Sequence, residues 1–142
     1  MAASASPKLR LLHIRDEIDG ATAAMQGVSF EEYSKSYTLR RVTERAIQTI
    51  SEAAKALPSN LTASYPAAPW HAIIAIGNIL RHEYQYVDDR RLWEIVTTHL
   101  PPLRTVVIEM LRDLGGLEGA DLPAPVLADP KIPPLTLPLP AS

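Results

Sequence analysis

The sequence contains no cysteine. This absence excludes a disulfide framework, a thiolate metal site and a cysteine nucleophile. Long hydrophobic runs are missing as well, because no apolar stretch approaches the roughly 20 residues that a membrane-spanning helix needs. Residues 1–6 also lack the apolar core of a signal peptide. We therefore expect a soluble protein that stays in the cytoplasm and has no membrane partner.

A strong net charge of either sign is also absent. The formal net charge of -2 gives the chain no overall attraction for nucleic acid. Basic residues are more frequent in the first half, and a single lysine follows Arg112, so RNA binding would need a local basic patch. The length of 142 residues and the hydrophobic share of 46% suit one compact domain.

Helical periodicity is present from the start of the chain. Ser6 followed by Pro7 is typical of a helix N-terminus, and apolar residues then recur at spacings of three and four until about Gly27. Ser29 and Glu32 have the spacing of a capping box, which predicts a short connector helix after the first long one. The chain is therefore predicted to begin with a long amphipathic helix followed by a short connector helix, as in a helical bundle.

The rest of the domain continues this pattern. A second long helix is predicted from about 38 to 57, a loop from 58 to 69, and a third helix from Trp70 to about Val87. Asp88 and Asp89 are good cap residues for a following helix. Prolines at 101 and 102 are expected to break or kink the chain before a last helical stretch at 103–114. No useful stretch alternates as a strand would. We predict an all-α, up-down bundle of four main helices plus a short connector.

The chain after the bundle has a different composition. We place the helical domain at 1–116 and a proline-rich tail at 117–142, since this proline content cannot continue a helix and favours extended structure. The tail is either flexible or an arm that lies on a neighbour. Its prolines are Pro123, Pro125, Pro130, Pro133, Pro134, Pro138 and Pro140, and the side chains that could contact a neighbour are Ile132, Leu135, Leu137 and Leu139.

The third predicted helix carries an unusual polar stretch from Gly77 to Tyr84. Helical spacing places Asn78, Arg81, His82 and Gln85 on one strip, with aliphatic residues on the other side. A glycine inside a helix costs about 1 kcal/mol relative to alanine, so Gly77 predicts the close approach of another helix or of a ligand. The strip is either an ordinary solvated surface or a functional site that binds or converts a ligand.

The strip has the groups that RNA cleavage needs. An imidazole takes and gives a proton near neutral pH, and a guanidinium presents a fork of donors to phosphate oxygens. His82 could deprotonate a ribose 2′-hydroxyl while Arg81 stabilises charge on the phosphorane, which needs no metal. The strip lacks the carboxylates of a metal site, so we expect neither a metal nor another cofactor.

Several motifs together resemble the HepT-like branch of the HEPN superfamily. The resemblance covers about Leu9 to Leu114 and implies an α-helical homodimer. It also implies a metal-independent ribonuclease toxin whose active site lies in a cleft where two motif helices meet. The implied partner is an MntA-type nucleotidyltransferase antitoxin, which transfers AMP to the motif tyrosine. The motifs are Gly-Asn-Ile-Leu-Arg-His-Glu-Tyr (77–84), Val-Asp (87–88), Leu-Trp-Glu-Ile-Val (92–96), Leu-Pro-Pro-Leu (100–103) and the helix at 41–54 with Glu-Arg-Ala and Ser-Glu-Ala.

By this resemblance His82 matches the motif histidine and Tyr84 the AMP acceptor. The pattern has an arginine where this chain has Gly77. Our first hypothesis is an RNA-cleaving toxin in which His82 is the general acid and base, Arg81 supplies phosphate electrostatics and Asn78 is the orienting residue. The second is a non-catalytic, HEPN-like dimeric module that docks a nucleotidyltransferase or a nucleotide. A third is a plain helical interaction protein.

Overall fold

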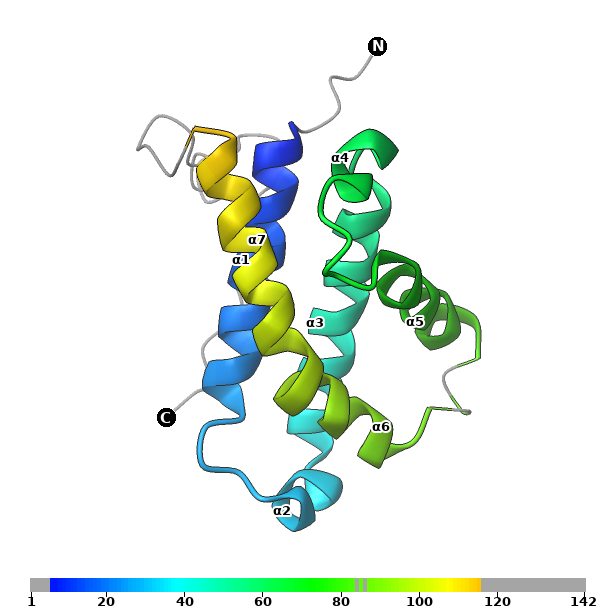
Figure 1. Ribbon diagram of the computed structural model, residues 1–142. Helices are drawn as coiled ribbons and strands as arrows, with labels where there is room; N and C mark the ends of the chain where they lie inside the picture. The colour runs from blue at the N-terminus through cyan, green and yellow to red at the C-terminus, as the bar shows by residue number, and fades with distance from the viewer. Residues whose placement is uncertain (1–5, 84, 86, 116–142) are drawn as a thin grey trace, which may run out of the picture.

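The computed structural model describes residues 6–83, 85 and 87–115, and this part of the chain contains helices but no strand. The long helices are α1 (Pro7–Ala24), α3 (Tyr37–Lys55), α5 (Trp70–His82) and α7 (Leu100–Asp113) (Figure 1). Shorter ones are α2 (Phe30–Lys35), α4 (Ser59–Ala63) and α6 (Asp89–Glu94). The predicted all-α bundle is confirmed.

Three helix starts form as the sequence predicts. The Ser6 hydroxyl accepts the Leu9 N–H at 3.2 Å, directly before the proline that opens α1. Ser29 and Glu32 form the predicted capping box, in which the Ser29 hydroxyl accepts the Glu32 N–H at 3.1 Å and donates to its carboxylate. Asp88 accepts the Arg91 N–H at 2.8 Å and so caps α6.

The core lies where α1, α3 and α7 pack together. Figure 1 shows α1 and α7 side by side, with α5 on the outer flank of α3. An exposed ion pair joins α1 to α7, since Arg104 donates to both carboxylate oxygens of Asp19. The largest fully buried aliphatic side chains come from these three helices and from α6: Leu11, Leu12, Ile14, Ile18, Ile50, Leu92, Val107, Met110 and Leu111.

A second packing layer holds α2 against α3 and α6. Trp93 lies within 5.7 Å of Phe30 and 5.6 Å of Tyr33, measured between ring centroids, so its indole serves this layer and not the polar stretch of α5. The buried Tyr33 hydroxyl shares a 2.7 Å hydrogen bond with Thr43. Burial raises the pKa of the Tyr33 phenol, which keeps it neutral and able to donate.

The structure corrects two boundaries. The third main helix was expected to reach about Val87, but α5 ends at His82, where Glu83 has φ -141° and leaves the helical region. Glu83 closes the helix: its N–H still donates to the Ile79 carbonyl at 2.7 Å, but its own φ and ψ are not helical. The segment 58–69 was expected to be loop throughout, yet it contains the short helix α4, whose first N–H bonds go to the Pro58 carbonyl.

The two adjacent prolines do not break the chain as expected. Helix α6 runs into a π-helical turn, η2 (Ile95–His99), which continues into α7, and Pro101 and Pro102 occupy the first turn of α7. Prolines have no N–H to donate, so a change in hydrogen-bond register just before them accommodates them without ending the helix.

The tail at 116–142 lies outside the described residues. None of the described helices has the length and apolar character of a transmembrane span.

Candidate active site

The polar residues predicted on the third helix meet at the C-terminal end of α5. Asn78, Arg81 and His82 are all classed as exposed, and Arg81 and His82 form the last turn of the helix. Gln85 lies beyond the helix end and is exposed, so it does not share the strip with them as expected. Tyr84 lies outside the described residues. The structure therefore places three of the predicted residues at the same helix end, where Arg81 contacts Asn78 and His82 follows Arg81 in the chain.

Arg81 links α5 to α3. One terminal nitrogen of its guanidinium donates to the Asn78 side-chain oxygen, and the other lies 3.3 Å from a carboxylate oxygen of Glu52. The Arg81 side chain keeps 29% of its accessible surface, and that of Glu52 keeps 51%. An ion pair this exposed contributes at most about 1 kcal/mol of stability, so its main effect is to hold the guanidinium in one orientation.

Asn78 does not orient the imidazole as expected. Its side-chain oxygen accepts from Arg81, and the His82 side chain makes no hydrogen bond or ion pair with another residue in the described ranges. His82 is therefore an open imidazole at the helix end, directly after a fixed guanidinium. Such a pair can exchange a proton with a ligand and can also bind a phosphate.

Helix packing explains why residue 77 of the motif is a glycine. Gly77 is buried where α5 crosses α3, and a Cβ on it would lie 1.9 Å from the Ser51 hydroxyl oxygen and 2.4 Å from the Ser51 Cβ. The Ser51 hydroxyl donates across the same crossing to the Ile74 carbonyl at 3.1 Å. The close helix approach expected at Gly77 is confirmed. With α3 at this distance, no side chain fits at position 77.

Glu52 is the site residue that sequence reasoning did not select. It belongs to the Ser-Glu-Ala segment of α3, and 29 positions separate it from Arg81, so no local spacing connects the two. The one available signal was the family resemblance of that segment. In the described ranges no three His, Asp or Glu side chains converge as a metal site would require.

Comparison with known proteins identifies the family to which the chain belongs. The model of the family described as ribonuclease HepT-like matches residues 14–110, which is most of the chain. The chain belongs to the HepT-like ribonuclease family. The resemblance to the HepT-like branch of the HEPN superfamily, predicted from the motifs, is thereby confirmed. The matched range contains α5 and the whole Asn78, Arg81 and His82 cluster.

Individual relatives of this HepT-like chain carry ribonuclease names. A protein of Caldanaerobacter subterraneus subsp. tengcongensis named "Putative RNase" is 33% identical over 107 residues, covering 75% of this chain and 96% of the relative. A Thermococcus cleftensis protein named "Probable ribonuclease HepT" is 30% identical over 77 residues, or 54% of this chain and 70% of the relative. No solved structure matches the chain significantly.

Proposed function

We propose that this chain is a metal-independent endoribonuclease toxin. The observation that carries the proposal is the open His82 imidazole at the end of α5 beside an Arg81 guanidinium held by Asn78 and Glu52. Membership in the HepT-like ribonuclease family and the ribonuclease names of its relatives support the same activity. An imidazole can transfer the proton and a guanidinium can stabilise the phosphate charge, so the proposed reaction needs no cofactor.

The proposed reaction is an internal transesterification of RNA. His82 takes the proton of a ribose 2′-hydroxyl, and the 2′ oxygen forms a bond to the neighbouring phosphorus. The bond from phosphorus to the 5′ oxygen breaks, and that oxygen takes a proton from the imidazolium that the first proton transfer forms on His82, which gives a 2′,3′-cyclic phosphate and a 5′-hydroxyl. Arg81 stabilises the charge that develops on the phosphate oxygens. DNA has no 2′-hydroxyl and cannot follow this route.

The proposed functional unit is a homodimer. Helix α5 packs chiefly against α3, which leaves an outer side with a shallow surface pocket of about 400 Å³. Its lining is apolar at Ala72, Ala75, Ile76, Ile79 and Val87 and charged at Glu83 and Arg91. Covering the apolar part of this pocket with a second apolar surface would remove it from water, which lowers the free energy. We assign a second copy to this surface, which would bring two His82 side chains to one cleft.

A cleavage assay in EDTA tests the activity. The purified full-length chain is incubated with a single-stranded RNA and with DNA of the same sequence. We expect RNA cleavage with 2′,3′-cyclic phosphate ends, while the DNA stays intact, because the nucleophile is the ribose hydroxyl. Cleavage of both nucleic acids, or activity that EDTA removes, would contradict the proposed chemistry.

The proposed inhibitor is an MntA-type nucleotidyltransferase antitoxin that transfers AMP to Tyr84. Added phosphate charge two residues after His82 would repel an RNA backbone. The test is co-expression with such a nucleotidyltransferase and intact-mass measurement. We expect the mass of one AMP group on the wild type and none on Tyr84→Phe, together with loss of RNA cleavage by the modified protein. A Tyr84→Phe chain that still gains the mass would place the acceptor elsewhere.

A second candidate function is a non-catalytic dimeric module that docks a nucleotidyltransferase or a nucleotide. Gly77 is the observation that favours it, because the family pattern has an arginine there and the α3 crossing excludes any side chain. This candidate predicts AMP transfer without RNA cleavage. The two functions are therefore separated by the EDTA assay together with the AMP-transfer measurement.

A further inference from the structure

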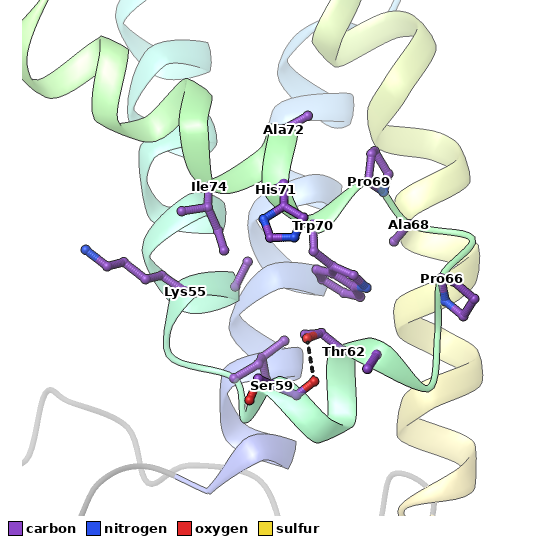
Figure 2. Close-up of a pocket in the computed structure, with 13 residues that line it drawn as sticks. Lys55, Ser59, Thr62, Pro66, Ala68, Pro69, Trp70, His71, Ala72 and Ile74 are labelled. Atoms are coloured by element: carbon purple, nitrogen blue, oxygen red, sulfur yellow. Dashed lines mark hydrogen bonds between the residues drawn. The ribbon is translucent and has the colours of Figure 1, made fainter.

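A second pocket lies at the other end of α5, away from His82. It is bounded by the C-terminal end of α3, by α4 and by the first turn of α5, and its volume is about 710 Å³ (Figure 2). Its lining is mainly apolar: Leu57, Pro66, Ala68, Pro69, Trp70 and Ile74 contribute to it. The HepT-like reaction proposed above uses none of these residues.

Trp70 is the central aromatic group of this pocket, as Figure 2 shows. Its indole N–H donates to the Tyr65 carbonyl at 3.0 Å, which fixes the ring in its orientation. Exposed side chains of Lys55 and His71 stand at the border and can donate hydrogen bonds. A fixed indole, two prolines and peripheral donors suit a ligand that is apolar and presents carbonyl acceptors.

The chain itself leaves α7 beside this pocket. The Tyr65 hydroxyl donates to the Asp113 carboxylate at 2.5 Å, and Tyr65 directly precedes the pocket residue Pro66. This hydrogen bond raises the pKa of the Tyr65 phenol. Asp113 is the last residue of α7, so the C-terminal end of this helix lies beside the loop that carries Pro66. Leu114, which directly follows α7, is 41% exposed.

We propose that this pocket binds the tail of the same chain through residues 132–139. That segment is Ile-Pro-Pro-Leu-Thr-Leu-Pro-Leu, which combines aliphatic side chains with prolines that have no N–H. Proline-rich segments in the polyproline II conformation bind to aromatic-lined grooves, because their backbone is already close to its bound shape. Extended chain advances about 3.1 Å per residue, so the segment reaches the pocket easily from α7.

Lys131 provides a direct test, because it is the single basic residue after Arg112 and therefore the one trypsin site in the tail. A short tether gives the tail an effective concentration on the order of millimolar, so even a site with a dissociation constant of about 0.1 mM would slow cleavage roughly tenfold. We expect trypsin to cut after Lys131 in the full-length chain about tenfold more slowly than in a free peptide of residues 121–142.

Two variants locate the bound segment. Ala63→Glu puts a carboxylate at an exposed position of the pocket lining, and Ala67→Glu makes the same change at an exposed loop position outside that lining. Cleavage should speed up to the peptide rate in the first variant and stay slow in the second. Replacing Leu135, Leu137 and Leu139 together by serine should also abolish protection, and this change leaves the sequence of the helices unaltered.

Three results would overturn the proposal. Equal cleavage of the full-length chain and the free peptide would show that the tail is not bound. Protection that survives Ala63→Glu would place the tail on another surface. Protection that falls as the protein is diluted would place the tail on a second copy, and so would exclude docking within one chain. RNA cleavage is not part of the measurement, so its outcome is independent of the proposed ribonuclease function.

Discussion

Replacement of His82 by alanine should abolish RNA cleavage in EDTA. We expect the rate to fall by about 10² to 10⁴, the usual contribution of a general acid or base. Stability should change little, because the side chain is exposed and makes no hydrogen bond or ion pair within the described ranges. The measurement compares initial cleavage rates of wild type and His82→Ala at neutral pH, with thermal unfolding of both followed by circular dichroism.

His71 provides the matched control for this prediction. It is also an exposed histidine on α5, but it belongs to the first turn of the helix, whereas His82 is its last residue. The His71→Ala variant should cleave RNA within about twofold of the wild-type rate. Equal cleavage by wild type and His82→Ala would remove the enzymatic proposal. If neither protein cleaves RNA while AMP transfer continues, the non-catalytic module becomes the better function.

Local chemistry explains what was predictable from the sequence. The starts of α1, α2 and α6 depend on a hydroxyl or carboxylate within three residues of the N–H that it accepts, so each was visible as a short motif. The clustering of Asn78, Arg81 and His82 follows in the same way from helical spacing. These features need no knowledge of the tertiary structure.

Contacts between distant segments explain what was missed. The partner of Arg81 is a glutamate on another helix, and helical spacing alone did not show that α5 ends at His82. Asn78 is a local case: helical spacing puts both Arg81 and His82 within reach of its side-chain oxygen, and that oxygen accepts from Arg81. Gly77 was recognised as a close-approach position, but the sequence could not show that Ser51 is the residue opposite it.

Substitution of Gly77 by alanine should destabilise the protein. At an unconstrained helix position, glycine to alanine gains about 1 kcal/mol. Here the new Cβ would lie 1.9 Å from the Ser51 hydroxyl oxygen, so α3 and α5 must move apart. Overpacking of this kind typically costs about 1–3 kcal/mol, and we expect a net loss in that range. Urea unfolding of wild type and Gly77→Ala at 25 °C measures the free energy of unfolding.

Ser51→Gly supplies the control that identifies the cause. Alone it should cost about 1–2 kcal/mol, because it removes the hydrogen bond to Ile74 and puts a glycine in α3. Combined with Gly77→Ala it should be less destabilising than the sum of the two, since the nearest remaining atom is the Cα of residue 51 at 3.8 Å. Strictly additive losses would show that this contact does not limit position 77.

The same pair of positions connects packing to catalysis. If Ser51→Gly makes room for a Cβ at position 77, it also makes room for the start of the arginine that the family pattern has there. The double variant Ser51→Gly with Gly77→Arg should therefore fold better than Gly77→Arg alone. Its cleavage rate beside that of the wild type then tests whether Arg81, held by Glu52 and Asn78, performs the proposed phosphate role without an arginine at position 77.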